Sequence, residues 1–358
     1  MTILNTFLAN LWWMIAESAP WLLLGFLIAG VINELVPAKW IKSSLGGRGY
    51  GAIFKAAIVG APLPLCSCGV IPTAVGIRRA GASRGATSSF LVATPETGVD
   101  SVSITYALMG PVMAIVRPIA AIISAIVSGT LVQSLTRTVA EQAPAQPAKK
   151  SCCGHNSNSV ESVRESRVAS VISAIRSVFA FSFGKLLKDI TKWLAIGLIG
   201  AALIKTFVPD SFFVQWGSGL WAMLAMIVIG IPMYICATAS TPLAAGLIMA
   251  GVSPGTALVF MLTGPATNIA TLGVIKNELG AKALLGHLTG VIVSAILAGS
   301  LLDYLIAKYQ WQLTLVAGHQ HSDVSFFASI SAIVLITLVV LNYLPKRLQP
   351  ALNDTANK

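Results

Sequence analysis

A chain of 358 residues with 55% hydrophobic and only 10% charged residues is far from the average soluble domain, in which about a quarter of the residues are charged. With a mean hydropathy of +0.80, the composition excludes a water-soluble fold. The net charge of +11 does not predict nucleic-acid binding, because the basic residues stand between apolar segments, as in the cytoplasmic loops of membrane proteins.

Apolar stretches of near-spanning length recur along the chain. A membrane-spanning helix needs about twenty such residues, somewhat fewer or more with tilt. The stretches cover Trp21 to Val36, Pro118 to Leu135, Trp193 to Val208, Ala283 to Leu302 and Phe326 to Leu344. The sequence therefore predicts an all-α polytopic protein in a lipid bilayer.

An internal repeat divides the chain into two halves. Pro62 to Gly110 aligns without a gap to Pro232 to Gly280, at an offset of 170 residues, and thirteen of forty-nine positions are identical. The identities include Cys66 with Cys236, together with several prolines and glycines that determine the backbone. We predict a first transmembrane repeat at 1–135 and a second at 178–310.

Two polar regions separate or follow the repeats. The stretch 136–177 contains an Ala/Pro/Gln run and is predicted to be a flexible cytoplasmic linker. The stretch 311–358 is predicted to hold an outer loop, one extra transmembrane helix and a tail. The sequence leaves the oligomeric state open.

In each half the second apolar element is interrupted by proline. Gly51 to Pro64 and Val70 to Arg79 are each too short to span, and Gly219 to Pro232 and Ala239 to Ala250 repeat the pattern. Proline removes a backbone donor and breaks a helix, and lipid tolerates such backbone only inside protein or beside a cavity. Paired interruptions of this kind indicate the binding site of a transporter.

The distribution of basic residues favours an inverted arrangement of the repeats. If each interrupted element is re-entrant and the N-terminus is outside, most basic residues fall in the cytoplasm; the exceptions are Arg117, Lys205 and Lys308. If these elements cross fully instead and the basic linker stays inside, Lys39, Lys42 and Arg48 move outside together with Lys346 and Arg347. The inverted arrangement is our prediction.

The cysteines are the first candidates for chemistry. Prolines and Gly69 favour an extended backbone at Cys66 and Cys68, which would direct both thiols to one place, and the repeat brings Cys236 to the equivalent point. Thiolates select soft ions such as Cu(I) and Zn(II), and trivalent arsenic by analogous chemistry. Cys152, Cys153 and His155 in the linker are candidates for capturing such an ion. Buried cysteines that only pack are the alternative.

Acidic and polar residues are the second group of candidates. Glu96 and Asp100 are four apart, and they share a helix face if this stretch is helical. Carboxylates within a membrane are costly without a use, so we predict a charge-compensating or proton-exchanging role; an ion pair with Arg117 or Arg78 is the alternative. Polar lining is predicted from the hydroxyl and amide groups of Thr97, Thr238, Thr267 and Asn268.

Three motifs carry a family resemblance. They are Pro62-Leu-Pro-Leu-Cys-Ser-Cys-Gly-Val-Ile-Pro72, Thr94-Pro-Glu-Thr-Gly-Val-Asp-Ser101 and Ile231-Pro-Met-Tyr-Ile-Cys-Ala-Thr-Ala-Ser-Thr-Pro242. The chain resembles the ArsP-type permease family, and within it the copper/zinc efflux branch. The resemblance covers nearly the whole chain. It implies an efflux permease of the bacterial inner membrane for soft metals or organoarsenicals, in which Cys66, Cys68 and Cys236 match the motif cysteines.

The sequence thus predicts a secondary-type efflux permease for Cu(I) or Zn(II) that is not an enzyme. Efflux of trivalent arsenicals is the alternative within the same class. A membrane thiol oxidoreductase that uses Cys66 and Cys68 is the alternative of another class. The chain has no phosphate-binding loop and no cofactor motif, so neither a cofactor nor ATP hydrolysis is expected.

Overall fold

The computed structural model describes residues 3–35, 38–47, 49–63, 65–136, 176–207, 219–231, 235–311, 313, 315 and 326–343. Every secondary-structure element in these residues is helical, which confirms the predicted all-α fold. The linker candidates Cys152, Cys153 and His155 lie outside the described residues.

The described residues of the first half form six helices. These are α1 (Ile3–Leu35), α2 (Ala38–Leu45), α3 (Tyr50–Gly60), α4 (Ser67–Arg79), α5 (Arg84–Glu96) and α6 (Val99–Leu135). The predicted interruption of the second apolar element lies between α3 and α4. A further bend lies within α6 at Gly110, whose φ of 77° is accessible to glycine at no steric cost.

The second half is described from residue 176 onward. After a π-helical turn, η1 (Phe181–Leu186), come α8 (Leu187–Phe207), α9 (Leu220–Gly230), α10 (Ala237–Met249), α11 (Pro254–Ala266), α12 (Ile269–Glu278) and α13 (Ala281–Tyr309). The extra C-terminal helix is α14 (Phe326–Tyr343).

Local contacts recur at equivalent positions of the two halves. Ser83 and Ser253 accept hydrogen bonds from backbone N–H groups at the starts of α5 and α11, both at 3.2 Å. The side chains of Gln133 and Asp303 also occupy equivalent positions. They accept hydrogen bonds from the backbone N–H groups of Gly85 and Gly255, at 3.2 and 2.7 Å. The sequence repeat is therefore accompanied by matching helix caps.

Within the described residues, three helices are long and apolar enough to cross a membrane: the segment Asn5–Ile32 of α1, together with α6 and α13. The helices α11 and α12 meet at an angle of 50°, and together they would form a fourth span if the chain crosses the membrane through both. The shorter apolar helices are α3, α9, α10 and the segment Phe326–Asn342. Short helices of this kind agree with the prediction that the proline-interrupted elements do not form simple spans.

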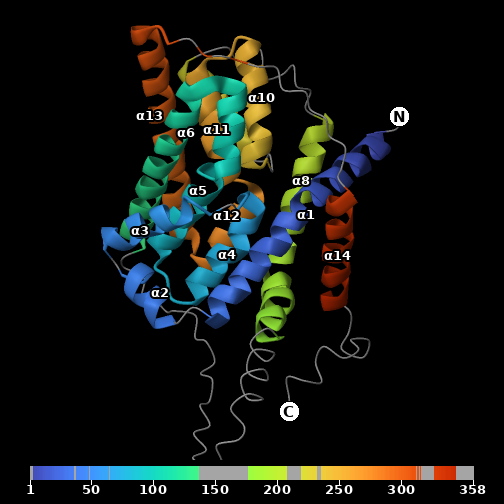
Figure 1. Ribbon diagram of the computed structural model, residues 1–358. Coiled ribbons are helices and arrows are strands. Elements are labelled where there is room, and N and C mark those ends of the chain that lie inside the picture. The colour runs from blue at the N-terminus through green and yellow to red at the C-terminus, as the bar shows by residue number, and fades with distance from the viewer. Residues whose placement is uncertain are drawn as a thin grey trace, which may run out of the picture.

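The helices form two packed groups (Figure 1). In one, α1 lies against α8 and α14; in the other, α6 packs on α5 and α13, and α11 packs on α13. α4 joins the groups because it packs on both α1 and α5. α2 and α4 lie toward the lower end of the bundle and α10 lies at the upper end.

The contact between α1 and α4 depends on two glycines. A Cβ atom added at Gly25 would lie 2.3 Å from the carbonyl oxygen of Gly69, a distance that real Cβ atoms do not reach. Thr73 reinforces the contact, since its hydroxyl donates to the carbonyl oxygens of Gly25 and Gly69 at 3.2 and 2.9 Å. This close packing fixes the position of α4 and of the cysteines at its start.

Candidate functional site

Two cysteines from different halves lie at the starts of α4 and α10. Cys66 and Cys236 are the N-cap residues of these helices and have extended backbones, with φ/ψ of −70°/171° and −71°/152°. Cys66 and Cys68 belong to one buried cluster against which Cys236 packs, and the thiol of Cys66 interacts electrostatically with the other two thiols. All three are free cysteines, and Cys66 and Cys68 are buried. The thiols thus lie where the two repeats pack together.

The predicted extended backbone is wrong for Cys68. α4 begins at Ser67, so Cys68 already lies in the first helical turn and only Cys66 is extended. The helix starts this early because Gly69 and Pro72 are accommodated inside it: Gly69 packs on α1, and Pro72 has a helical φ by constraint. Among the described residues, no group of three or more His, Cys, Asp or Glu side chains is arranged to hold a metal ion.

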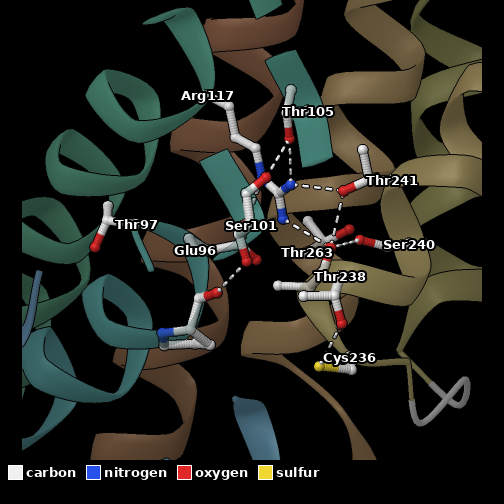
Figure 2. A network of polar contacts seen from close by, with 12 residues as sticks. Glu96, Thr97, Ser101, Thr105, Arg117, Cys236, Thr238, Ser240, Thr241 and Thr263 are labelled. Atoms are coloured by element: carbon white, nitrogen blue, oxygen red, sulfur yellow. Dashed lines mark hydrogen bonds and ion pairs between the residues drawn. The ribbon is translucent and has the colours of Figure 1, made fainter. Parts of the chain in front are cut away.

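A buried ion pair lies beside the thiols. Arg117, in the middle of α6, donates from Nη2 and Nε to Glu96 Oε2 at 3.0 and 3.2 Å, and both side chains are fully buried. The Nη1 group of Arg117 donates to the hydroxyls of Thr105 and Thr241, both at 2.8 Å. Nη2 also donates to the carbonyl oxygen of Ala237 at 3.1 Å. Arg117 therefore connects the end of α5 to the first turn of α10 (Figure 2).

The hydrogen-bonding capacity of the pair is used unequally. A guanidinium group has five N–H donors, and the five bonds of Arg117 use them all. Glu96 Oε1, by contrast, is buried and has no hydrogen-bond partner. Such an atom is costly in an apolar interior, so it is the most conspicuous unsatisfied acceptor in the network.

The ion pair reaches the residue next to Cys236. Arg117 donates both to Glu96 and to the carbonyl oxygen of Ala237, which follows Cys236 in the chain. Thr238, at the start of α10, donates from its hydroxyl to the sulfur of Cys236 at 3.3 Å (Figure 2). The structure therefore brings together residues of α4, α5, α6 and α10 around Cys236.

The family of the chain follows from its sequence profile. The profile of an ArsP-type family described as "Predicted permease" matches residues 3–304. The chain belongs to this permease family. No solved structure matches it.

Three relatives illustrate the range of this permease family. The UPF0718 protein YraQ of Escherichia coli is 26% identical, over 78% of this chain and 75% of its own length. A UPF0718 protein of Methanocaldococcus jannaschii is 23% identical, over 78% of this chain and 89% of its own. A Streptococcus mutans protein, whose name describes it as a two-component membrane permease complex subunit, is 24% identical, over 76% of this chain and 86% of its own.

The family and the fold make the chain a multi-pass bacterial membrane permease. Permeases of this family are transporters and not enzymes, so the alternative of a thiol oxidoreductase has no support. The assignment to a copper/zinc branch stays a prediction.

Glu96 and Asp100 do not share a helix face in the permease. α5 ends at Glu96 and α6 begins at Val99, with Gly98 as its N-cap residue, so a helix end separates the two carboxylates. Glu96 is fully buried, whereas Asp100 is partly exposed in the first turn of α6. Pro95 and Gly98 explain the break, and the carboxylates therefore have different surroundings.

The predicted polar lining has mainly structural partners. The Thr97 hydroxyl donates to the carbonyl oxygens of Ala61 and Ala93 at 3.0 and 2.8 Å, which ties the end of α5 to α3. Thr267 donates within its own turn at 2.6 Å, and Asn268 caps α12 by accepting the N–H of Thr271 at 2.8 Å. Of the four predicted residues, only Thr238 contacts a thiol.

Sequence reasoning gave Arg117 too small a role. In the sequence analysis Arg117 is an exception to the cytoplasmic placement of basic residues and one possible ion-pair partner of Glu96. In the structure its side chain is completely buried. Its partners Thr105 and Thr241 were missed. A lone arginine in an otherwise apolar stretch was the available signal, because a charge at that depth needs a partner.

Proposed function

We propose that this permease moves a thiophilic cation, Cu(I) before Zn(II), out of the cell through the site formed by Cys66 and Cys236. The packing of Cys236 on the buried cluster that contains Cys66 supports the proposal, because the two cysteines cap equivalent helices of the two repeats. The direction of transport is an inference from the family resemblance.

The chemistry of the thiol pair favours a soft ion. Thiolates bind Cu(I) strongly, and the positive ends of α4 and α10 stabilise negative charge on their N-cap residues. Two sulfurs suffice for Cu(I), which accepts linear coordination, whereas structural Zn(II) sites need four ligands. Since the described residues contain no group of three or more such ligands arranged for a metal, we place Cu(I) first.

Efflux of a trivalent arsenical remains the second candidate. Its supporting observation is that Cys68 lies in the same buried cluster as Cys66, so a third thiol is available near the pair. Three thiolates can bind trivalent arsenic, but Cys68 would have to turn from the first turn of α4 toward Cys236. Transport of arsenite without transport of Cu(I) would decide for this alternative.

The test is transport by the pure permease in vesicles. We expect Cu(I) to accumulate in inverted vesicles that contain the wild-type protein, and we expect Cys66→Ser and Cys236→Ser each to reduce the initial rate at least tenfold. Cu(I) should also protect Cys236 from alkylation. Zn(II) and arsenite are measured in parallel as competing substrates.

The linker cysteines provide a matched control. The double variant Cys152→Ser/Cys153→Ser removes two thiols but none of those at the helix starts, so we expect transport within about twofold of wild type, because a polar linker contributes at most to local capture. Cu(I) transport that is unchanged in Cys66→Ser and Cys236→Ser would contradict the proposal and leave the thiols as packing residues.

A further inference from the structure

We propose that the uncovered face of α10 is the surface on which α8 docks in a second state of the permease. In that state the two repeats exchange their arrangements, so that α8 covers α10 in the way that α1 covers α4 in the structure. The uncovered face consists of four residues that share one side of the helix: Ala239, Pro242, Leu243 and Gly246. The inference concerns the transport cycle and holds for any ion that the permease carries.

The long helices α6 and α13 are related by a local two-fold axis. The hydroxyl of Ser294 donates to that of Ser124 at 2.7 Å, and these residues are equivalent in the two repeats, 170 positions apart. One turn further along α6, Ser128 meets Gly290, one turn back along α13: a Cβ atom added at Gly290 would lie 2.5 Å from Cα of Ser128. Equivalent helices thus pack antiparallel and cross at equivalent residues. Both are long and apolar enough to span, so the axis would lie in the plane of the bilayer.

α4 and α10 are equivalent helices, but their surroundings differ on this face. The corresponding residues of α4 are all buried: Gly69, Pro72, Thr73 and Gly76. α1 covers them, because a Cβ atom added at Gly76 would lie 3.1 Å from that of Ala29. On α10, three of the four residues are partly exposed and Gly246 is exposed. A Cβ atom added at Gly246 meets no described residue within 4 Å.

α8 is the helix of the second repeat that corresponds to α1. The contact of α1 with α4 uses two small residues four positions apart, Gly25 and Ala29. α8 has Gly197 and Ala201 at the same spacing in the sequence, after Trp193, which matches the tryptophan of α1. Small residues at this spacing let two helices approach closely within a membrane. In the structure, however, α8 packs on α1 and α12.

The composition of the uncovered face favours a helix over lipid tails as its partner. Ala239 and Gly246 are small, and helix contacts within membranes are enriched in small residues. Ala239 and Leu243 stand where α4 has Gly69 and Thr73, so α8 and α10 would dock at a slightly larger separation than α1 and α4. Lipid tails are the alternative occupant of this face.

Arg117 holds α10 in its present place. Its guanidinium group donates to the hydroxyl of Thr241 and to the carbonyl oxygen of Ala237, and α10 packs on α6. The equivalent residue of the second repeat is His287. Its partners lie in α5, α6 and α11 instead: Ser88, Ser128 and the carbonyl oxygen of Ala266. Exchange of the two arrangements therefore requires the release of α10 from Arg117.

The exchange would give the thiols access in turn. Cys66, at the start of the covered helix α4, is buried, whereas Cys236, at the start of α10, is partly exposed. Docking of α8 on α10 would bury Cys236, and departure of α1 from α4 would expose Cys66. This is the behaviour that alternating access requires of a site placed between two repeats.

The first experiment fills the uncovered face. Gly246→Leu should fold and melt as wild type does, because the structure has room for the added side chain. It should lower the initial rate of Cu(I) transport by about tenfold or more, because α8 can no longer approach. Gly51→Leu in α3 is the matched control, since a Cβ atom there also meets no described residue within 4 Å, and its rate should equal that of wild type. A folded Gly246→Leu that transports at the wild-type rate overturns the inference and assigns the face to lipid.

The second experiment detects the docked state and requires no substrate. In a variant without the linker cysteines, Ala201→Cys and Gly246→Cys are combined, because these positions correspond to the contact of Ala29 with Gly76. A short bismaleimide should join the two new cysteines, as identified by mass spectrometry of the digested protein, and the joined protein should no longer transport. Ala201→Cys with Gly51→Cys is the control pair and should not be joined.

The two experiments separate this inference from the proposed function. If Ala201→Cys and Gly246→Cys are not joined, α8 does not reach α10 and the inference is overturned, whatever the permease transports. Failure of the wild type to transport Cu(I) would instead overturn the proposed function, and the cross-link would still report whether α8 docks on α10.

Discussion

At the scale of single residues, the most demanding feature is Arg117. It is fully buried, and its five donors are divided between one residue of α5, one of α6 and two of α10. A buried ion pair is weak evidence for stability, but the removal of one partner leaves the other charge uncompensated. The pair therefore makes each of its members depend on the other.

We expect Arg117→Met to destabilise the permease by about 3–5 kcal/mol, because Glu96 would remain buried without its cation. The double variant Arg117→Met/Glu96→Met should recover most of the lost stability, since apolar side chains of similar size replace the pair. Apparent melting temperatures in detergent measure both effects. A single variant as stable as wild type would show that the ion pair is dispensable for folding.

The residue scale also shows where sequence reasoning reached its limit. The repeat was sufficient to predict that Cys66 and Cys236 occupy equivalent points, because it needs only the alignment. The partners of Arg117 were out of reach, since Thr105 and Thr241 lie 12 and 124 residues away and their meeting depends on how three helices are rotated. The helical state of Cys68 was missed because its neighbours Gly69 and Pro72 were taken as helix breakers, although tertiary packing accommodates both.

At the scale of elements, α4 is held in place by its contact with α1. Gly25 approaches the backbone of Gly69 so closely that no side chain fits between the helices. α4 carries Cys66 at its start and Arg79 at its end, so its position determines both the place of this thiol and the contact with α12.

We expect Gly25→Ala to destabilise the permease by about 1–3 kcal/mol, because the added methyl group must push two backbones apart. The displacement should also separate Cys66 from Cys236 and speed the alkylation of both. Gly51→Ala in α3 is the matched control, since a Cβ atom there meets nothing within 4 Å, and it should be neutral or slightly stabilising. Equal melting temperatures for both variants would contradict the packing argument.

The end of α4 contacts the second half through Arg79. Its Nη2 group forms ion pairs with Glu278 of α12, at 2.5 Å, and with Asp189 of α8, at 2.9 Å. Part of each side chain is exposed, with 16%, 20% and 43% of the three accessible. Partly exposed pairs contribute about 1 kcal/mol or less to stability, so their main effect is on the contact between α4 and α12.

We therefore expect Arg79→Gln and Glu278→Gln each to speed the alkylation of Cys66 by up to about fivefold, with little change in melting temperature. The double variant should be no faster than either single one, because both lose the same interaction. Lys276→Gln, exposed on the same helix, is the control. Additive effects of the two variants would show that Arg79 and Glu278 act independently.

At the scale of the whole molecule, the same ion pair distinguishes the two topologies. With re-entrant interrupted elements, Arg79 and Glu278 both lie on the cytoplasmic side. If these elements cross fully and the linker stays inside, Arg79 remains on the cytoplasmic side but Glu278 moves outside. The ion pair between Arg79 and Glu278, at 2.5 Å, would then be impossible. α4 and its equivalent α10 lie toward opposite ends of the bundle, which also favours inverted repeats (Figure 1).

The topology can be tested by labelling single cysteines from one side of the membrane. In a variant without Cys152 and Cys153, we expect Ser43→Cys and Asn277→Cys, both exposed, to react with an impermeant maleimide only in inverted vesicles. Trp221→Cys, at the start of α9 and 76% exposed as tryptophan, should react only in right-side-out vesicles and serves as the control, because both topologies place it outside. In the re-entrant topology, α1 carries the chain inward and the first interrupted element returns to the same side. The basic residues around Lys42 then lie in the cytoplasm, as the positive-inside rule predicts. Labelling of Ser43→Cys and Asn277→Cys from outside would show instead that the interrupted elements cross the membrane and that the repeats are not inverted.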